Sequence, residues 1–220
     1  MGERRKRWRM MKRGVVLLLG VLISGVVMAG ETAQEMLDKV RQKYDSVNDA
    51  QLKFSQRVVF GVSKIEQKTN GTLFLKKKNK YRMELGSQTI VTDGKTVWSY
   101  SVPNNQVLID NFKLDERSMT PERLLTGSSG EFYTTLIGNE KLGKVDVVVL
   151  KLVPKDDESI IKSMKLWVDE STWFIKKVEL VDVNGKETEY VVDDLQVNVG
   201  LQDSRFVFKI AEGVQVVDLR

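Results

Sequence analysis

The sequence predicts a mainly β protein (α+β) whose core is an antiparallel sheet that curls toward a barrel. Apolar and polar residues alternate at a period of two in about ten short segments between residues 52 and 210. The dipeptides Asp93-Gly94 and Asn184-Gly185, which suit tight hairpin turns, connect neighbouring segments. So many consecutive hairpins favour a curled sheet over a flat one.

The first 29 residues have the order of a Sec-type signal peptide. A basic stretch with seven Lys or Arg and one Glu precedes the apolar run 14–27 and Met28-Ala29. An N-terminal membrane anchor is the alternative, but the run is shorter than the ~20 residues of a span. We therefore expect cleavage after Ala29 and a single exported domain, residues 30–220, whose 28 basic and 29 acidic residues lower the formal charge from +5 to −1.

A helix is predicted directly after this segment. Thr32-Ala33-Gln34-Glu35 has the spacing of a capping box. Behind it, apolar residues recur at helical spacing up to Tyr44, with charged residues between them. We predict one amphipathic helix that ends near Asp45.

Strands are predicted over most of the remaining chain. In residues 80–85, for example, Tyr81, Met83 and Leu85 alternate with charged residues. The predicted strands are 52–60, 72–76, 80–85, 88–92, 96–101, 106–110, 146–154, 163–169, 173–182, 186–198 and 205–210.

One long insertion interrupts the strands, because the alternation stops between Asp110 and Gly143. Within it, Thr120 is a good N-cap, Pro121 suits the first helical position and Gly127 suits the end, so we predict a short helix. Its apolar residues Leu124 and Leu125 need a surface to cover, and the inside of a curled sheet offers one.

The composition argues against catalysis. The chain has no Cys and no His, so it lacks thiol and imidazole nucleophiles, the corresponding metal ligands, disulfides and an acylated cysteine. Asp156-Asp157-Glu158 is typical of a solvated turn, and Asp193-Asp194 alternates faces within a strand. We predict no enzyme, no metal and no cofactor, and the near-neutral exported domain argues against nucleic acid as a partner.

An ordered set of motifs resembles a known family. The set comprises Phe54-Ser55-Gln56, Gly71-Thr-Leu-Phe-Leu-Lys-Lys-Lys, Tyr81-Arg-Met-Glu-Leu, Thr89-Ile-Val-Thr-Asp-Gly-Lys-Thr-Val-Trp-Ser-Tyr, Gln106-Val107, Thr120-Pro121 with Leu124-Leu125, and Phe206-Val-Phe with Gly213-Val214. In this order, from about residue 31 to 219, the chain is similar to the periplasmic outer-membrane lipoprotein carriers, the LolA family.

The resemblance implies an unclosed, strongly curved antiparallel β-barrel of about 10–11 strands, with an N-terminal helix and short lid helices over an apolar cavity. It also implies a soluble periplasmic carrier, expected as a monomer, that binds the acyl chains of lipoproteins. Such carriers take their cargo from an ATP-driven release complex of the inner membrane and deliver it to the outer membrane, to a lipoprotein receptor where one is present.

The resemblance assigns Lys77 to a latch. Family members have a basic residue there, usually Arg followed by Pro, that holds the lid through backbone carbonyls. Here Lys78 replaces the Pro, and a lysine lacks the planar fork of arginine, so we expect a looser latch. Without the resemblance, the basic cluster 76–82 is better explained as a strand end and turn kept soluble by lysines, which also block edge pairing.

We further hypothesise that six residues line the acyl-chain cavity under the lid residues Leu124 and Leu125: Leu73, Leu75, Tyr81, Met83, Val91 and Trp98. A one-residue slip in register would move each of them to the other face of the sheet. Two other functions stay open. One is a periplasmic module on the same fold that senses lipid or lipoprotein and binds a protein partner, and the other is a carrier of a different lipid.

Overall fold

The structure is a computed structural model that describes residues 31–113 and 130–220. Glu31–Arg220 form one compact unit. Its elements, in chain order, are α1 (Ala33–Asp45), β1 (Asp49–Val59), β2 (Glu66–Lys76), β3 (Lys80–Leu85), β4 (Gln88–Asp93), β5 (Thr96–Ser101), β6 (Gln106–Asn111), β7 (Phe132–Leu142), β8 (Val145–Pro154), β9 (Ile161–Asp169), β10 (Ile175–Asp182), β11 (Glu187–Val197), η1 (Asp203–Phe206) and β12 (Gln215–Asp218).

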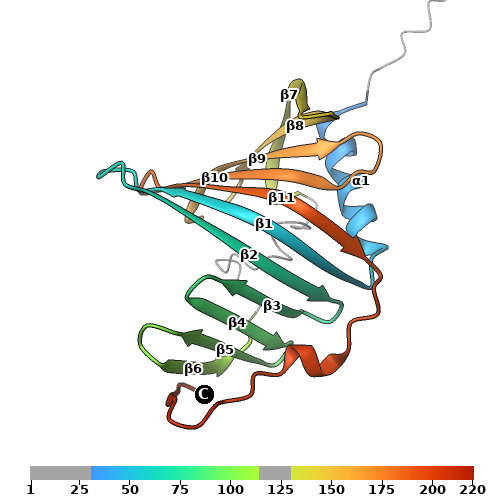
Figure 1. Ribbon diagram of the computed structural model, residues 1–220. Helices are drawn as coiled ribbons and strands as arrows, with labels where there is room; N and C mark the ends of the chain where they lie inside the picture. The colour runs from blue at the N-terminus through green and yellow to red at the C-terminus, as the bar shows by residue number, and fades with distance from the viewer. Residues whose placement is uncertain (1–30, 114–129) are drawn as a thin grey trace, which may run out of the picture. The chain divides into compact units, whose positions relative to one another are not determined.

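The described strands form a single curved, unclosed sheet (Figure 1). Their order is β12-β6-β5-β4-β3-β2-β1-β11-β10-β9-β8-β7, so β12 and β7 are the two edges. Neighbours are antiparallel except β12, which runs parallel to β6. The predicted class, a mainly β, unclosed and curved antiparallel sheet with an N-terminal helix, is confirmed, with twelve strands in the described residues where 10–11 were expected.

Helix α1 begins and ends where the sequence predicts. The Thr32 hydroxyl accepts a hydrogen bond from the Glu35 N–H at 3.2 Å, and the Thr32 N–H donates to the Glu35 carboxylate at 2.8 Å. The reciprocal pair satisfies two N–H groups that a helix start leaves without partners. Among the described residues the helices are α1 and η1, and neither has the length or the apolar run of a membrane span.

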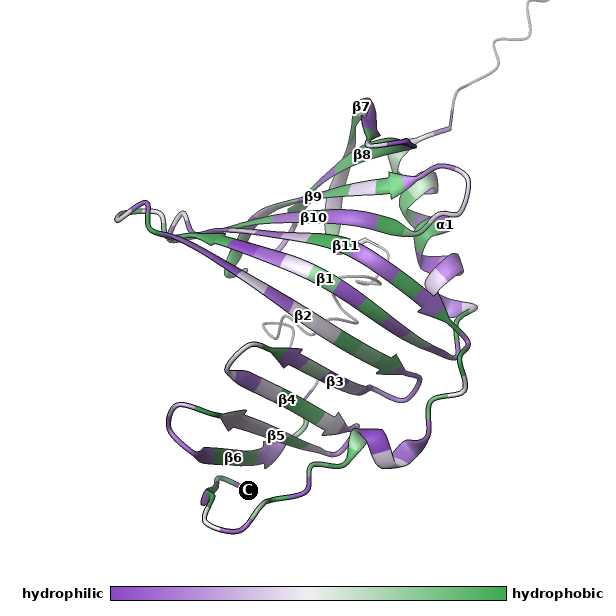
Figure 2. Cartoon of the chain, in the orientation of Figure 1, coloured by the Kyte–Doolittle hydropathy of each residue, from purple (hydrophilic) through white to green (hydrophobic). Residues whose placement is uncertain are grey.

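The sheet has two faces with different covers. The face on which α1 packs, called the helix face, carries a first group of buried residues, the helix cluster, in which Leu37 and Val40 of α1 contact β8, β9 and β10. The C-terminal segment contacts the opposite face, where η1 lies against β3 and β4. Hydrophobic and hydrophilic residues alternate along strands such as β1 (Figure 2), as expected for a sheet whose two faces differ in cover.

The sequence prediction missed strand β7, which lies inside the supposed insertion. β7 forms a hairpin with β8, but the register shifts between Leu136 and Gly138. This bulge breaks the alternation of side chains, and Tyr133 and Ile137 on this edge strand are exposed. A strand that is mostly exposed and bulged lacks the period-two pattern used to predict strands.

The predicted strand 205–210 is wrong. Residues 203–206 form η1, and the chain joins the sheet only at β12. Phe206 is fully buried, and Phe208 contacts the Tyr100 ring at 5.5 Å between centroids. Alternating apolar residues in this segment therefore reflect packing onto a sheet face instead of strand pairing.

Two predictions concern segments outside the described residues. They are the signal peptide, residues 1–29, and the short helix with Leu124 and Leu125.

Candidate functional site

A second apolar group, the strand cluster, lies on the helix face beyond α1. Its buried members are Leu52, Phe54, Leu73 and Tyr81, and the partly buried side chains packed on them are Leu75, Met83, Leu85, Ile90, Phe112, Tyr190 and Leu195. The two clusters meet at Tyr190, which packs on both. Whereas α1 fills the helix cluster, the described residues that pack on the strand cluster come from strands and from Phe112.

Strand register explains why this surface is uncharged. Residues directly opposite each other in paired strands share a face. Leu73 is opposite Met83, which is opposite Ile90, and Leu75 is opposite Tyr81. The three charged residues of β3 occupy the alternate positions and so lie on the other face.

Two phenols, which are neutral near pH 7 even at the ordinary tyrosine pKa, belong to the strand cluster. Burial raises the pKa of Tyr81 and the pKa of Tyr190 above the ordinary value for tyrosine. The Gln56 amide donates a hydrogen bond to the Tyr190 hydroxyl at 3.0 Å, which satisfies that polar group. The strand cluster can therefore receive an apolar ligand without placing a charge against it.

Two motifs that are separate in the sequence meet in the strand cluster. Phe54 on β1 is directly opposite Gly71 on β2. A Cβ atom at position 71 would lie 2.4 Å from Cζ of Phe54, so the ring occupies the space above the glycine. Gly71 is thus required by the close approach of the ring.

We predict that Gly71→Ala destabilises the fold by about 1–3 kcal/mol, because the buried Phe54 ring must move. Phe54→Leu removes the clashing Cζ atom. The double variant should be more stable than the sum of the two single changes predicts, by about 1 kcal/mol. Urea unfolding of the four proteins measures this coupling, and strict additivity would contradict the contact.

The structure separates the six predicted cavity residues. Leu73, Leu75, Tyr81 and Met83 belong to the strand cluster on the helix face. Val91 is opposite both Arg82 and Trp98, in a row that continues to Phe74 and Ile109 on the other face. The expectation that all six line one surface is therefore wrong for Val91 and Trp98.

The C-terminal segment explains why Val91 and Trp98 are apolar. The Arg205 guanidinium lies 4.3 Å above the centre of the Phe74 ring, in the same cross-strand row as Val91. Lys76 and Lys80 hold this segment through Asp203, at 2.6 and 2.9 Å. The two lysines lower the pKa of Asp203 to about 2. Val91, which is fully buried, thus lies on the face that the C-terminal segment covers, and Trp98, which is half-buried, is opposite it on the same face.

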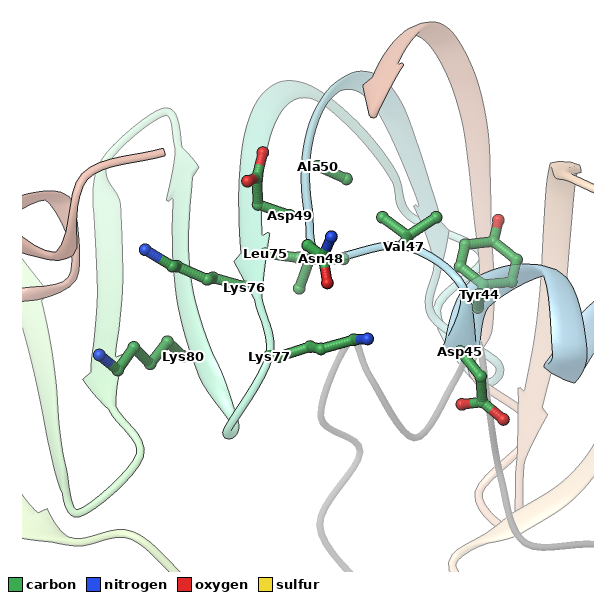
Figure 3. A pocket seen from close by; sticks show the side chains of 10 residues that line it. All are labelled: Tyr44, Asp45, Val47, Asn48, Asp49, Ala50, Leu75, Lys76, Lys77 and Lys80. Carbon is green, nitrogen blue, oxygen red and sulfur yellow. The ribbon is translucent and has the colours of Figure 1, made fainter. Parts of the chain in front are cut away.

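A pocket of about 120 Å³ lies at one end of the strand cluster, where α1, β1 and β2 meet (Figure 3). Its lining residues are Tyr44, Asp45, Val47, Asn48, Asp49, Ala50, Leu75, Lys76, Lys77 and Lys80. Leu75 lines the pocket and also packs on the strand cluster. Leu75 therefore links the lining of the pocket to the strand cluster.

Lys77 differs from the other lysines of the basic cluster. Figure 3 shows its side chain extending toward α1, whereas Lys76 and Lys80 extend away from it toward the segment that holds Asp203. The Lys77 side chain is exposed, and its backbone N–H donates to the Asn48 carbonyl at 3.1 Å. Its backbone is thus held beside the pocket that its side chain lines, while the residues it was predicted to latch lie outside the described ones.

The turn after Lys77 cannot contain the proline that is typical of the family at position 78. Lys78 and Asn79 have φ angles of 71° and 58°. The ring of proline fixes φ near −65°. Lys78 in place of the family's proline therefore goes with a turn whose backbone conformation proline cannot adopt.

Lys78→Pro should lower the free energy of unfolding by more than about 1 kcal/mol, because proline cannot adopt the positive φ. Lys78→Gly is the matched control, since glycine adopts this conformation freely, and it should be at least as stable as the wild type. Thermal unfolding compares them. Equal stability of the two variants would contradict the turn geometry.

Comparison with known proteins now adds to the geometry. The family model of the outer membrane lipoprotein carrier protein LolA matches residues 45–209, about three quarters of the chain. The chain belongs to the LolA family. An outer-membrane lipoprotein carrier protein of Glaesserella parasuis is 28% identical over 214 residues, which cover 96% of this chain and 97% of the relative.

Further relatives agree with the LolA assignment. A carrier protein of the same description from Chromohalobacter salexigens is 28% identical over 177 residues, covering 79% of this chain and 82% of the relative. Among solved structures, an uncharacterised conserved protein of Thermus thermophilus superposes with a TM-score of 0.57 at 17% identity, covering 84% of this chain and 98% of that one. This last likeness concerns the fold alone.

The acidic side chains of the described residues are dispersed. No three carboxylates among residues 31–113 and 130–220 cluster as a metal site would require. What the arrangement offers a ligand is the apolar area of the strand cluster next to a pocket whose lining includes two aspartates and three lysines.

Proposed function

We propose that the protein is a periplasmic carrier that holds the acyl chains of lipoproteins on the strand cluster. The observation that carries the proposal is the apolar surface of β1–β4 and β11. Helix α1 packs on the helix cluster and does not cover this surface. Family membership supports the same role, because relatives across the LolA family are described as lipoprotein carriers.

The energetics favour a carrier. Each buried methylene is worth ~0.8 kcal/mol, so one long acyl chain exposes roughly 10 kcal/mol of apolar surface to water. A lipoprotein without a carrier would therefore leave a membrane very slowly. The carrier need only shelter the chains well enough to keep them in solution and weakly enough to release them.

The path of an acyl chain follows from the geometry. A pocket of about 120 Å³ is smaller than the ~300–1,000 Å³ of typical ligand sites, so it would receive one end of a chain. The rest would lie along Leu75, Leu73 and Met83, which are contiguous on the helix face. In this arrangement Leu124 and Leu125 of the predicted lid would cover the chain, and Lys77 would hold the lid.

The proposal extends to partners and place of action. An ATP-driven release complex of the inner membrane would load the carrier, and the outer membrane, with a lipoprotein receptor where present, would unload it. The basic and apolar order of residues 1–29 supports export to the periplasm.

Binding of a fluorescent acyl probe to the purified domain tests the proposal. We expect saturation at about one probe per chain and competition by a triacylated lipopeptide. Competition by phospholipid but not by lipopeptide would indicate a carrier of another lipid. Failure of the folded protein to bind the probe would remove the carrier function and favour a sensing module.

A further inference from the structure

Exposed apolar side chains gather at three turns at one end of the sheet. They come from the β1–β2, β8–β9 and β10–β11 turns. The set, called the turn cluster, is Phe60, Val62, Ile65, Ile160 and Val183, all of which are exposed. In Figure 1 the β1–β2 turn, at the left of the view, extends beyond the neighbouring strands, with the β10–β11 turn beside it.

Contacts between the turns make the cluster one surface. A Cβ atom at Gly61 would lie 2.6 Å from the Gly185 carbonyl, so the first and third turns touch. The Val183 N–H donates to the Ile160 carbonyl at 3.1 Å, which joins the third turn to the second. Within the β1–β2 turn, the Phe60 N–H donates to the Ile65 carbonyl at 3.0 Å and holds the tip closed.

The tip itself contributes nothing to the core. Val62 is 99% exposed and Ile65 is 58% exposed, so their side chains are available to an external partner. Between residues 60 and 65 the only charged side chain is Lys64, and it is also exposed; the exposed acids Asp156, Asp157 and Glu158 lie in the β8–β9 turn, outside the tip. A protruding apolar tip with one cation is complementary to a lipid surface, where apolar side chains enter the interface and a lysine meets anionic headgroups.

We propose that the turn cluster is the surface by which the carrier touches a lipid bilayer. A lipid surface is favoured over a protein partner because the β1–β2 turn protrudes from the sheet (Figure 1) and the exposed apolar residues of the three turns include no Trp or Tyr, which are enriched in protein interfaces. The choice of a bilayer rests on the proposed function, since acyl chains leave and enter a membrane. The contact itself requires no bound cargo, because the turns are separate from the strand cluster.

Flotation of the cargo-free protein with vesicles of phosphatidylethanolamine and phosphatidylglycerol tests the proposal. The wild type should float with the vesicles. Val62→Asp/Ile65→Asp should lower the vesicle-bound fraction about tenfold or more, because charged groups at the tip resist entry into the interface. Both positions are exposed, so the variant should fold and bind the acyl probe like the wild type.

Ile210→Asp is the matched control, because Ile210 is 43% exposed and lies in the C-terminal segment, outside the turn cluster. It should float like the wild type. An equal loss in the control variant would mean general adhesiveness and would overturn the proposal. A wild type that binds the acyl probe but not the vesicles would also overturn it, while leaving the carrier function intact. If the tip variants instead lose binding to an inner-membrane release complex, the turn cluster is a protein contact and the bilayer assignment is wrong.

Discussion

Replacing Met83 by lysine is expected to lower the affinity for an acyl probe at least about tenfold while the protein stays folded. Met83 lies between Leu73 and Ile90 on the strand cluster and is only partly buried. An ammonium at this position must either lose water when an acyl chain binds or exclude the chain. Either cost exceeds the 1.4 kcal/mol that corresponds to a tenfold change.

Glu84→Lys is the control for this change. It places the same ammonium on the next residue of β3, which lies on the opposite face of the sheet. Probe affinity should be close to that of the wild type. Similar losses of probe affinity in the two variants would show that the acyl chain does not bind specifically to the helix face. The assignment of the binding site to the strand cluster would then be wrong.

Replacing Lys77 by leucine is expected to slow delivery of lipoprotein to the outer membrane about tenfold, with acyl-probe binding retained. The ammonium at the pocket rim is a donor that can hold a lid through carbonyl groups, and a charged hydrogen bond contributes about 1.5–3 kcal/mol. Without it, the protein should favour an open form that keeps its cargo on the apolar surface. Transfer of a labelled lipoprotein between inner- and outer-membrane fractions measures the effect.

Lys77→Arg is the informative control, because it keeps the charge and adds the planar donor fork common in the family. It should transfer cargo, and should hold the closed form more tightly than lysine does. Transfer by Lys77→Leu at the wild-type rate would leave Lys77 as a solvated strand-end residue without a latch role.

The sequence predicted the helix face best where the opposite face is polar. In β3, charged residues alternate with Tyr81, Met83 and Leu85, so the pattern indicates one apolar face, and the structure places these residues in the strand cluster. Helix α1 could be predicted equally well, because its capping box and apolar spacing are local properties of the sequence.

The pattern failed where both faces are covered. In β4, Ile90 and Val91 are adjacent and both apolar, since Ile90 packs on the strand cluster and Val91 is buried on the other face. The cover of that second face comes from η1, more than a hundred residues later in the chain. No local pattern in β4 or β5 records which of its faces a distant segment will occupy, so Val91 and Trp98 were assigned to the wrong one.

The ion pairs that hold the C-terminal segment show the same limit of prediction from local sequence. Lys76, Lys77 and Lys80 are one basic cluster in the sequence. The structure divides them, because two bind Asp203 and the third points to the pocket. A distant carboxylate thus separates lysines that the local sequence does not distinguish.

Mass spectrometry of the lipid that co-purifies with the protein from the periplasm tests the central claim most directly, which is that the strand cluster holds the acyl chains of lipoproteins. We predict that acylated lipoproteins co-purify with the wild type and with Glu84→Lys, and are strongly reduced in Met83→Lys. Recovery of phospholipid alone, or of equal amounts of lipoprotein with Met83→Lys, would contradict the claim.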